Sequence, residues 1–332
     1  MSQAYRDAGV DTELAAKAVS LIAELAADAT RPEVAGGLGG FAGLYRIGDG
    51  RLLAASTDGV GTKLEIARLA GRLDTVGIDL VAMCADDVVC TGAEPLFFLD
   101  YLAVGKVVPE RVASIVEGVA EGCRRAGCAL LGGETAEHPG VLADDAFDLA
   151  GTCVGAVNEA DLLGPERVAE GDALIGLAST GLHSNGYSLI RSAVLPRFAL
   201  DEVPAGLDRP LVDELLEPCA IYAPDVLALA RDGLLRAAAH VTGGGIVENL
   251  PRVLPDGVGA EIERGSWGEP PIFGFVREAT GATDEELFAT FNMGVGMILV
   301  VPSERTEDVV GRSRQHASRI GSVVRGGGVR IA

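Results

Sequence analysis

The feature that most constrains this chain is a series of glycine-rich polar segments, most of which follow a short apolar, strand-like run. Glycine lets the backbone turn tightly and approach a ligand closely, because it has no Cβ atom. Where such a segment joins a strand to a helix, the free N–H groups of the helix start also attract anions. The series therefore predicts sheets with helices packed on them and ligand-binding loops at the strand ends. The segments are residues 36–41, 56–63, 132–140, 179–187 and 240–245.

Apolar periodicity predicts helices and strands in alternation along the chain. The expected helices are residues 11–29, 79–91, 109–126, 187–195 and 246–250. The expected strands are residues 52–56, 97–104, 129–131, 147–157, 173–178, 237–241 and 296–301. Polar turn residues interrupt the pattern around residues 158–171, and we place a domain boundary there. We expect an α/β (α+β layered) fold of two related sheet-plus-helix domains, residues 1–165 and 166–332.

The chain has 332 residues and a formal net charge of −21 at pH 7. Such a surface repels nucleic acids and anionic membranes, so we expect neither as a partner. It does not exclude a nucleotide, because exposed charges more than about 8 Å from a phosphate are largely screened at physiological salt. We expect no signal peptide, and no apolar run approaches the roughly 20 residues of a membrane span. We therefore expect a cytoplasmic protein, with six free cysteines rather than disulfides.

The segment at residues 56–63, STDGVGTK, follows a strand and opens a helix. Asp58 offers hard oxygen ligands suited to Mg²⁺, and Lys63 can neutralise a phosphate. The glycines allow backbone N–H groups to approach phosphate oxygens, although the spacing is not that of a P-loop. The alternative interpretation is a tight turn that exposes one lysine and one aspartate.

Two further segments carry carboxylates. Asp86 and Asp87 are adjacent in an apolar helix, where an unpaired buried charge is unfavourable and a cation would relieve it. The alternative has one aspartate facing solvent while the other accepts backbone hydrogen bonds. Glu134 follows an apolar strand, where its carboxylate would point into a cleft, and Glu137 and His138 are candidate proton-transfer groups. A structural histidine is the alternative in that loop.

Donors gather in the segment at residues 179–187, which includes His183, Ser184 and Asn185. Hydroxyl, imidazole and amide groups at a helix start suit a phosphate or a sugar. The alternative is an ordinary helix start capped by Ser184 or Asn185. Three successive glycines follow Thr242, and they weaken a fold unless the backbone must come close to something. We interpret residues 291–296 as mainly structural.

Taken in order, these segments resemble phosphoribosylformylglycinamidine cyclo-ligase, a family also called aminoimidazole ribonucleotide synthetase. The resemblance covers most of the chain, from YRDAGVD at residues 5–11 to the strand that ends near Val301. Residues 87–95 also match the D-x4-G-A-x-P pattern of a wider superfamily that includes thiamine-monophosphate kinase. The chain departs from the family at Asp86, where asparagine is usual, and its tail beyond Val301 matches weakly.

The resemblance implies an ATP-dependent ligase of purine biosynthesis. It would close the imidazole ring of formylglycinamidine ribonucleotide, giving 5-aminoimidazole ribonucleotide, ADP and phosphate. In this reaction the formyl amide oxygen is phosphorylated, and the neighbouring amidine nitrogen then attacks the formyl carbon. Such a phosphoryl transfer needs positioning and charge neutralisation more than covalent help from the protein. The alternatives are a small-molecule kinase resembling thiamine-monophosphate kinase, and a nucleotide-binding protein that kept the loops without the chemistry.

The resemblance also implies roles for these residues and a homodimer, in which two N-terminal sheets pair into a barrel. The expected Mg²⁺ ligands are Asp58, Asp87 and Glu134. The expected ATP-binding residues are Asp58, Gly59, Gly61, Thr62 and Lys63, with Gly39 and Gly40 in a mobile lid. The expected substrate-binding residues are His183, Ser184, Asn185, Thr242, Gly243 and Gly244. The expected catalytic residues are Lys63, Glu137 and His183, the last two as candidate proton acceptors.

Overall fold

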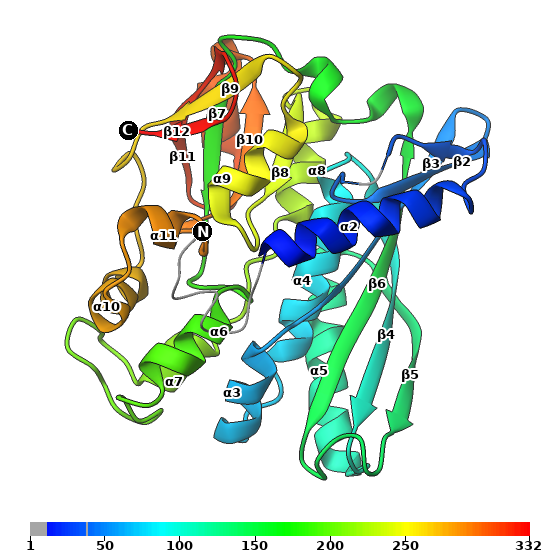
Figure 1. Cartoon of the computed structure of the whole chain (residues 1–332). Helices are drawn as coiled ribbons and strands as arrows, with labels where there is room; N and C mark the ends of the chain where they lie inside the picture. The colour runs from blue at the N-terminus through cyan, green and yellow to red at the C-terminus, as the bar shows by residue number, and fades with distance from the viewer. Residues whose placement is uncertain (1–11, 38) are drawn as a thin grey trace.

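The computed structural model describes residues 12–37 and 39–332 and shows two sheets, each with helices packed against it (Figure 1). The fold class predicted from the sequence, two sheet-plus-helix domains, is confirmed. The motif at residues 5–11, the first residue of the helix expected at residues 11–29 and residue 38 of the expected lid lie outside the described residues. Within the described part of the chain, no helix has both the length and the apolar character needed to cross a membrane.

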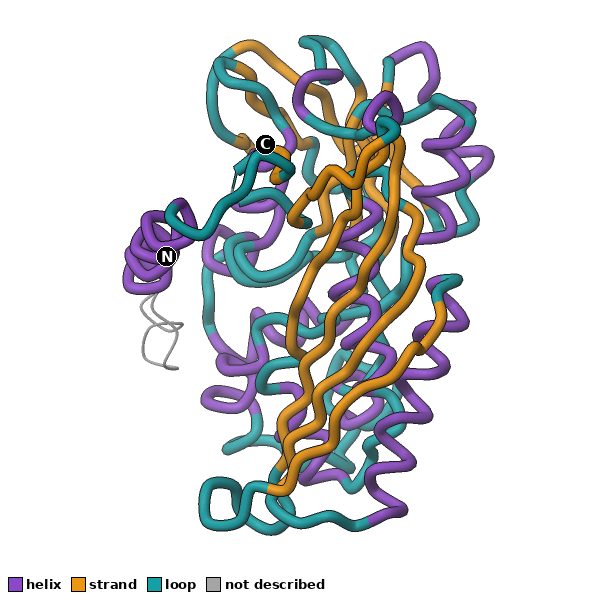
Figure 2. Tube along the Cα trace, turned by 90° about the vertical axis from the view of Figure 1, so that its right-hand side faces the viewer, coloured by secondary structure: helices purple, strands orange, loops and turns teal. Residues whose placement is uncertain are grey.

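The N-terminal sheet has the strand order β1-β2-β3-β6-β4-β5, and all its pairs are antiparallel except β4 with β5. Every second residue of β6 from Phe147 to Val157 is buried, so one face packs on helices while the other is turned outward. Figure 2 shows the long strands running side by side along the molecule. The strands are β1 (Val34–Ala35), β2 (Gly43–Gly48), β3 (Arg51–Gly59), β4 (Glu94–Val104), β5 (Ala129–Glu137) and β6 (Phe147–Asn158).

Helices α4 (Val76–Val89) and α5 (Pro109–Ala126) pack on the inner face of this sheet and against each other. Glycine allows their close approach, because a Cβ atom on Gly77 would lie 2.2 Å from the backbone nitrogen of Val119. Helix α4 also contacts β8 and α8 of the second domain. It is therefore covered on all sides, and Asp87 alone among its 14 residues is not buried. The remaining N-terminal helices are α2 (Thr12–Ala27) and α3 (Lys63–Ala70).

The C-terminal sheet has the order β12-β9-β11-β7-β10-β8, antiparallel except for β12 with β9. Its strand β10 is buried along its whole length, which matches its continuous apolar sequence. The strands are β7 (Ala173–Ala178), β8 (Ala237–His240), β9 (Val258–Ile262), β10 (Val295–Val301), β11 (Ala317–Arg325) and β12 (Val329–Ile331). The α-helices are α6 (Tyr187–Leu189), α7 (Leu211–Leu215), α8 (Ala223–Arg231), α9 (Gly245–Asn249), α10 (Pro271–Thr280), α11 (Asp284–Phe288) and α12 (Thr306–Arg312).

Most predicted elements are present, but three predictions need correction. Residues 57–59 and 132–137, expected in loops, extend the strands β3 and β5. Their glycines and polar residues hide this in the sequence, whereas pairing with β6 and β4 keeps the backbone extended. The helix expected at residues 187–195 is the short α6 followed by a π-helical turn, Ile190–Val194. Several elements have no counterpart among the predicted ones: the strands β1, β2, β9, β11 and β12 and the helices α7, α8, α10, α11 and α12.

Candidate functional site

Three ionisable side chains meet where α4 ends between the two sheets. The Asp87 carboxylate accepts a hydrogen bond from the Ser56 hydroxyl at 3.1 Å, and its other oxygen lies 3.0 Å from Nδ1 of His240. Asp58 follows two residues after Ser56 on β3, and therefore on the same face of the sheet. Its Oδ1 accepts the N–H of Gly59 at 2.7 Å. The structure thus brings the predicted ligands Asp58 and Asp87 together; we call them the acidic pair.

The electrostatics of the acidic pair favour a bound cation. Burial raises the pKa of the Asp58 carboxyl, and the charge of Asp87 raises it further against the opposing effects of the Gly59 N–H and His240. Burial alone would lower the pKa of His240, but the hydrogen bond and charge of Asp87 outweigh it, so this pKa is raised. Two carboxylates that repel each other in a partly desolvated site are stabilised by a positive ion, and their hard oxygens suit Mg²⁺.

Asp86 points away from the acidic pair, because neighbouring residues of an α-helix such as Asp86 and Asp87 project in directions about 100° apart. It is fully buried, and its Oδ1 accepts the N–H of Tyr222 at 2.9 Å. Its Oδ2 has no hydrogen-bond partner within the described part of the chain. Burial raises the pKa of Asp86 to about 7. One aspartate therefore accepts a backbone hydrogen bond, as in the alternative interpretation, while Asp87 belongs to the site.

The loop between β7 and α6 holds His183 in a fixed orientation. Its Nε2 accepts the N–H groups of Thr180 at 3.3 Å and Ala220 at 3.4 Å. Burial, with the nearby charges of His240 and Lys63, lowers the pKa of His183 to about 3. The ring is therefore neutral at pH 7 and carries its proton on Nδ1. His183 is a hydrogen-bond donor in this site, and the predicted role of proton acceptor does not fit it.

Other residues fix this loop from behind. The Oδ1 of Asn292 accepts the Ser179 hydroxyl at 2.8 Å, and its Nδ2 donates to the carbonyl of Gly181 at 2.9 Å. Gly296 leaves room for two rings, because a Cβ atom there would lie 2.1 Å from the Tyr222 hydroxyl oxygen and 2.7 Å from Cε1 of His183. The segment at residues 291–296 thus has a structural role toward the loop.

The glycine turn after β8 lies beside the same loop. A Cβ atom on Gly243 would lie 3.4 Å from Oδ1 of Asn185, so two of the predicted substrate-binding segments adjoin. Gly244 and Gly245 have φ of 89° and 60°, which favours glycine at both positions. The buried amide of Asn249 donates to the carbonyls of Gly243 at 3.1 Å and Gly245 at 2.9 Å. The turn is therefore held in one shape next to Asn185.

Lys63 does not lie where the sequence predicts. Its side chain is fully buried, and its Nζ is 2.8 Å from Oδ2 of Asp79. It also donates to the carbonyls of His183 at 3.1 Å and Glu217 at 2.8 Å. The charge of the ammonium is therefore balanced by Asp79 inside the protein, so this lysine does not serve to neutralise a phosphate. A lysine after a glycine-rich segment looks exposed in the sequence, but here the second domain covers the start of α3.

Glu134 and Glu137 are not part of the acidic pair. Glu134 is paired with Tyr101, Tyr101 with Ala150 and Ala150 with Gly59. Three strand spacings place it about 14 Å from β3, on the face opposite Asp58. Glu137 lies further along β5, where it accepts the N–H of residue 107 at 2.7 Å. Within the described residues, no group of three or more acidic, histidine or cysteine side chains is arranged to hold a metal ion.

Residues 36, 37, 40 and 41 of the glycine loop line a cavity of about 710 Å³ between the domains, next to the end of α4. Arg252 of the second domain donates to the carbonyls of Gly39 at 3.1 Å and Gly40 at 2.6 Å. Its guanidinium also lies 3.8 Å from the centre of the Phe41 ring. The predicted lid is therefore docked on the second domain through two carbonyl groups and one ring.

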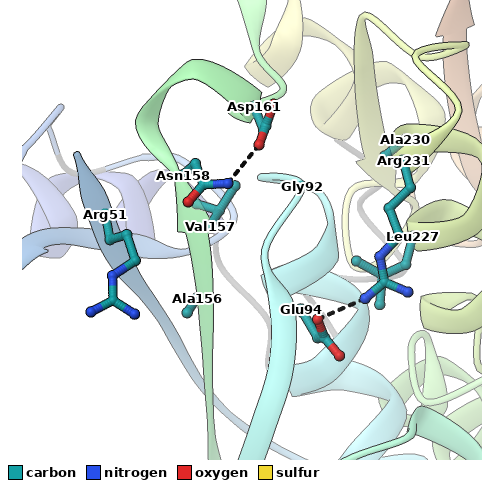
Figure 3. Close-up of a pocket in the computed structure, with 10 residues that line it drawn as sticks. All are labelled: Arg51, Gly92, Glu94, Ala156, Val157, Asn158, Asp161, Leu227, Ala230 and Arg231. Carbon is teal, nitrogen blue, oxygen red and sulfur yellow. Dashed lines mark hydrogen bonds and ion pairs between the residues drawn. The ribbon is translucent and has the colours of Figure 1, made fainter. Parts of the chain in front are cut away.

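A second pocket, of about 410 Å³, lies at the opposite end of β3 (Figure 3). Four of its polar side chains form two pairs: Glu94 with Arg231 at 2.6 Å, and Asn158 with Asp161 at 2.8 Å. Arg51 lines it at the first position of β3, about 23 Å from Asp58 along the strand. No predicted site residue is among its lining residues, so we place the site at the acidic pair.

Three residues of this region are missing from the predicted site: His240, Asp79 and Arg252. A signal for His240 exists, because it ends a buried strand directly before a glycine turn. Asp79 and Arg252 carry no local signal, since each matters through a contact with a residue far away in the sequence.

The fold and the site define a two-domain α/β protein with an acidic, donor-rich site at the junction of its domains. Two family profiles match it: "AIR synthase related protein, N-terminal domain" over residues 39–157, and "AIR synthase related protein, C-terminal domain" over residues 169–332. This chain belongs to the family of AIR synthase related proteins.

Curated relatives match the chain over its length. A protein of Geobacillus kaustophilus named phosphoribosylformylglycinamidine cyclo-ligase is 49% identical over 341 aligned positions, covering 100% of this chain and 99% of the relative. A protein of the same name from Shouchella clausii is 51% identical over 316 positions, covering 93% and 92%. The family resemblance in the sequence is thus confirmed. The solved structure "AaThiL complexed with AMPPCP and TMP" has a TM-score of 0.68 at 17% identity, covering 94% and 91%, which shows the shared fold.

Proposed function

We propose that this chain is a phosphoribosylformylglycinamidine cyclo-ligase of purine biosynthesis. It would convert formylglycinamidine ribonucleotide and ATP to 5-aminoimidazole ribonucleotide, ADP and phosphate. The observation that carries the proposal is the 49% identity, over the whole chain, to a relative of that name. The site is compatible with it, since an acidic pair and a set of neutral donors suit the binding of phosphorylated ligands.

ATP and Mg²⁺ are part of this proposal. A structure of the same fold is described as a complex with AMPPCP, which supports a nucleotide site in this architecture. The acidic pair fits Mg²⁺, because this ion is usually held by one or two carboxylates together with substrate phosphates. Asp58 and Asp87 would hold it, and it would neutralise charge on the transferred phosphoryl group. Glu134 lies too far from this pair to join it within one chain.

The other residues of the site bind and orient. His183 offers an Nδ1–H donor, and Asn185 with the glycine turn at residues 242–245 offers amide and backbone groups beside it. We assign the ribose 5-phosphate end of the substrate to this donor-rich side. The glycine loop, with Gly39 and Gly40, would cover the neighbouring cavity when it is docked on Arg252. Covering the cavity excludes water, which protects a phosphorylated intermediate from hydrolysis.

We also propose a homodimer formed through the outward face of the N-terminal sheet. Apolar side chains are exposed on that face: Leu99 by 39%, Tyr101 by 42% and Leu131 by 64%. Pairing two such faces would bury them, as in the barrel expected from the family resemblance. Glu134 and the hydrogen bond between Tyr101 and His138, at 3.1 Å, lie on this same side. Sedimentation of the purified protein would show a mass near 68 kDa for a dimer of this 34.1 kDa chain.

The test of the function is an incubation with formylglycinamidine ribonucleotide, ATP and Mg²⁺. Diazo coupling measures the aromatic amine, and a phosphate assay measures the second product. Equal appearance of amine and phosphate is the expected result. Phosphate without amine would refute the ligase, and thiamine monophosphate would then be tried as a phosphoryl acceptor.

A matched pair of variants connects the activity with the site. Asp87→Asn should abolish the formation of both products, because it removes one carboxylate of the acidic pair. Asp232→Asn makes the same chemical change at an exposed aspartate that pairs with Arg312, and it should leave the activity unchanged. Equal activity of the two variants would place the reaction elsewhere on the molecule.

A further inference from the structure

Lys63 and Asp79 form a buried ion pair outside the acidic pair. Neither side chain is exposed, and Nζ lies 2.8 Å from Oδ2. Burial alone would lower the pKa of Lys63, but the charge of Asp79 outweighs it and raises this pKa, so the ammonium keeps its charge. Desolvation of two charges offsets most of their attraction, so a buried pair adds little net stability. The contacts of this ion pair therefore point to a role other than stabilising the fold.

These contacts tie the second domain to the first. Lys63 begins α3 and Asp79 lies in the first turn of α4. The ammonium donates to the carbonyls of His183 at 3.1 Å and Glu217 at 2.8 Å, while Oδ1 of Asp79 accepts the N–H of Cys219 at 2.8 Å. One ion pair thus fixes the backbone of His183 and both ends of the short segment at residues 217–219.

That segment leads directly to one of the two backbone donors of the His183 ring. Ala220, which follows it, donates its N–H to Nε2, and Thr180 also donates its N–H to the same atom. The Thr180 hydroxyl in turn donates to the carbonyl of Pro218 at 2.6 Å. His183 itself has φ of 60°, a left-handed conformation that a non-glycine residue keeps only when its surroundings impose it. Orientation and tautomer of the ring therefore depend on the anchored segment.

We propose that Lys63 is a positioning residue: together with Asp79, it holds His183 in the orientation and tautomer that present Nδ1–H to the substrate. The part of this inference that concerns the substrate rests on the proposed ligase function. The part that concerns the ring depends only on the hydrogen bonds around Nε2. The two parts can be tested separately.

Nitrogen NMR of the four histidines of the chain measures which ring nitrogen of His183 carries the proton, and the variant His183→Gln assigns its signal. In the native protein His183 should show the neutral form with its proton on Nδ1. The variant Lys63→Met/Asp79→Asn replaces both charges by neutral groups of similar volume and avoids the unpaired buried carboxylate that Lys63→Met alone would leave. It should melt within about 5 °C of the native protein. Its His183 should show a mixture of both neutral tautomers.

Turnover tests the positioning role. The double variant should lose at least about 100-fold in kcat, since a misplacement near 1 Å has that effect, while the KM for ATP changes less than about threefold. Lys63→Gln/Asp79→Asn keeps two N–H donors and should recover part of kcat. The control Arg312→Met/Asp232→Asn likewise removes both charges of an ion pair, here an exposed one with a nitrogen–oxygen distance of 2.8 Å, and should match the native protein.

Two results would overturn the proposal. One is a native His183 with its proton on Nε2, which decides the question even where the variants do not fold. The other is a folded double variant whose tautomer and kcat equal those of the native protein. If the native protein does not close the ring at all, the proposed function fails, and the NMR comparison still decides the role of Lys63.

Discussion

Replacing Asp86 with asparagine should stabilise the protein at neutral and alkaline pH. The Asp86 side chain is fully buried, with one oxygen bonded to the N–H of Tyr222 and the other without a hydrogen-bond partner in the described part of the chain. Burial is the main cause that raises its pKa to about 7; the charge of Asp87 adds to it, and His240 and the Tyr222 N–H oppose it. Asparagine keeps an acceptor for Tyr222 and carries no charge.

The magnitude follows from the pKa of Asp86 in the two states. In the unfolded chain an aspartate titrates near about pH 3.9, some 3 units below the folded value of about 7. Below about pH 4 both states are protonated, so Asp86 has no effect on the free energy of unfolding. As the pH rises, the unfolded state loses its proton first and is favoured. Above the folded pKa of about 7 the loss of stability is complete, at about 4 kcal/mol.

Urea unfolding at pH 5 and pH 8 measures this effect, in EDTA so that no divalent cation binds at Asp87. The advantage of Asp86→Asn over the native protein should grow by about 3 kcal/mol between the two pH values. Asp232→Asn, which removes an exposed carboxylate, should show no such growth. An advantage of equal size at both pH values would refute the argument that burial raises the pKa of Asp86 in the folded state.

Three further substitutions test the site and its supports. Asp87→Asn should lower ATP-dependent turnover by at least about 100-fold in a steady-state assay; unchanged turnover would remove this carboxylate from the site. Gly296→Ala should lower the free energy of unfolding by about 1–3 kcal/mol, because its Cβ atom would lie 2.1 Å from the Tyr222 hydroxyl oxygen. The control is Gly274→Ala, where an added Cβ atom would meet no neighbouring atom within 4 Å, and thermal unfolding measures both variants. Arg252→Ala should speed hydrogen exchange in the glycine loop, which loses two hydrogen bonds; equal exchange would mean that other contacts hold it.

Local sequence patterns account for much of the fold. The helix α5 and the strand β7 have the bounds that the sequence predicts. In α5 a proline begins the first turn and a glycine with φ of 78° ends the last, so both ends are marked in the sequence itself. Residues 132–137 show the opposite case, because nothing in their composition marks a strand and only pairing with β4 makes them one.

Part of the site can also be predicted from the sequence. Asp58 and Asp87 are found because each stands next to a feature that a sequence displays: a glycine-rich turn after a strand, or a charge within an apolar helix. The donor-rich loop around His183 is found for the same reason. The low pKa of His183 cannot be predicted in this way, because it comes from burial and from the charges of His240 and Lys63. Its tautomer cannot either, because one of the two N–H groups that fix it belongs to Ala220, which is 37 residues away.

The sequence by itself thus determines the two-layered domains, the family and the positions of the loops, since these depend on residue types and spacing along the chain. The tertiary structure alone decided that Lys63 is a buried anchor, that Glu134 lies on the opposite face from Asp58, and that His240 joins Asp87. The physical reason is the same in each case. The role of a charged group depends on how far it is desolvated and on which partner reaches it, and both are set by elements distant in sequence.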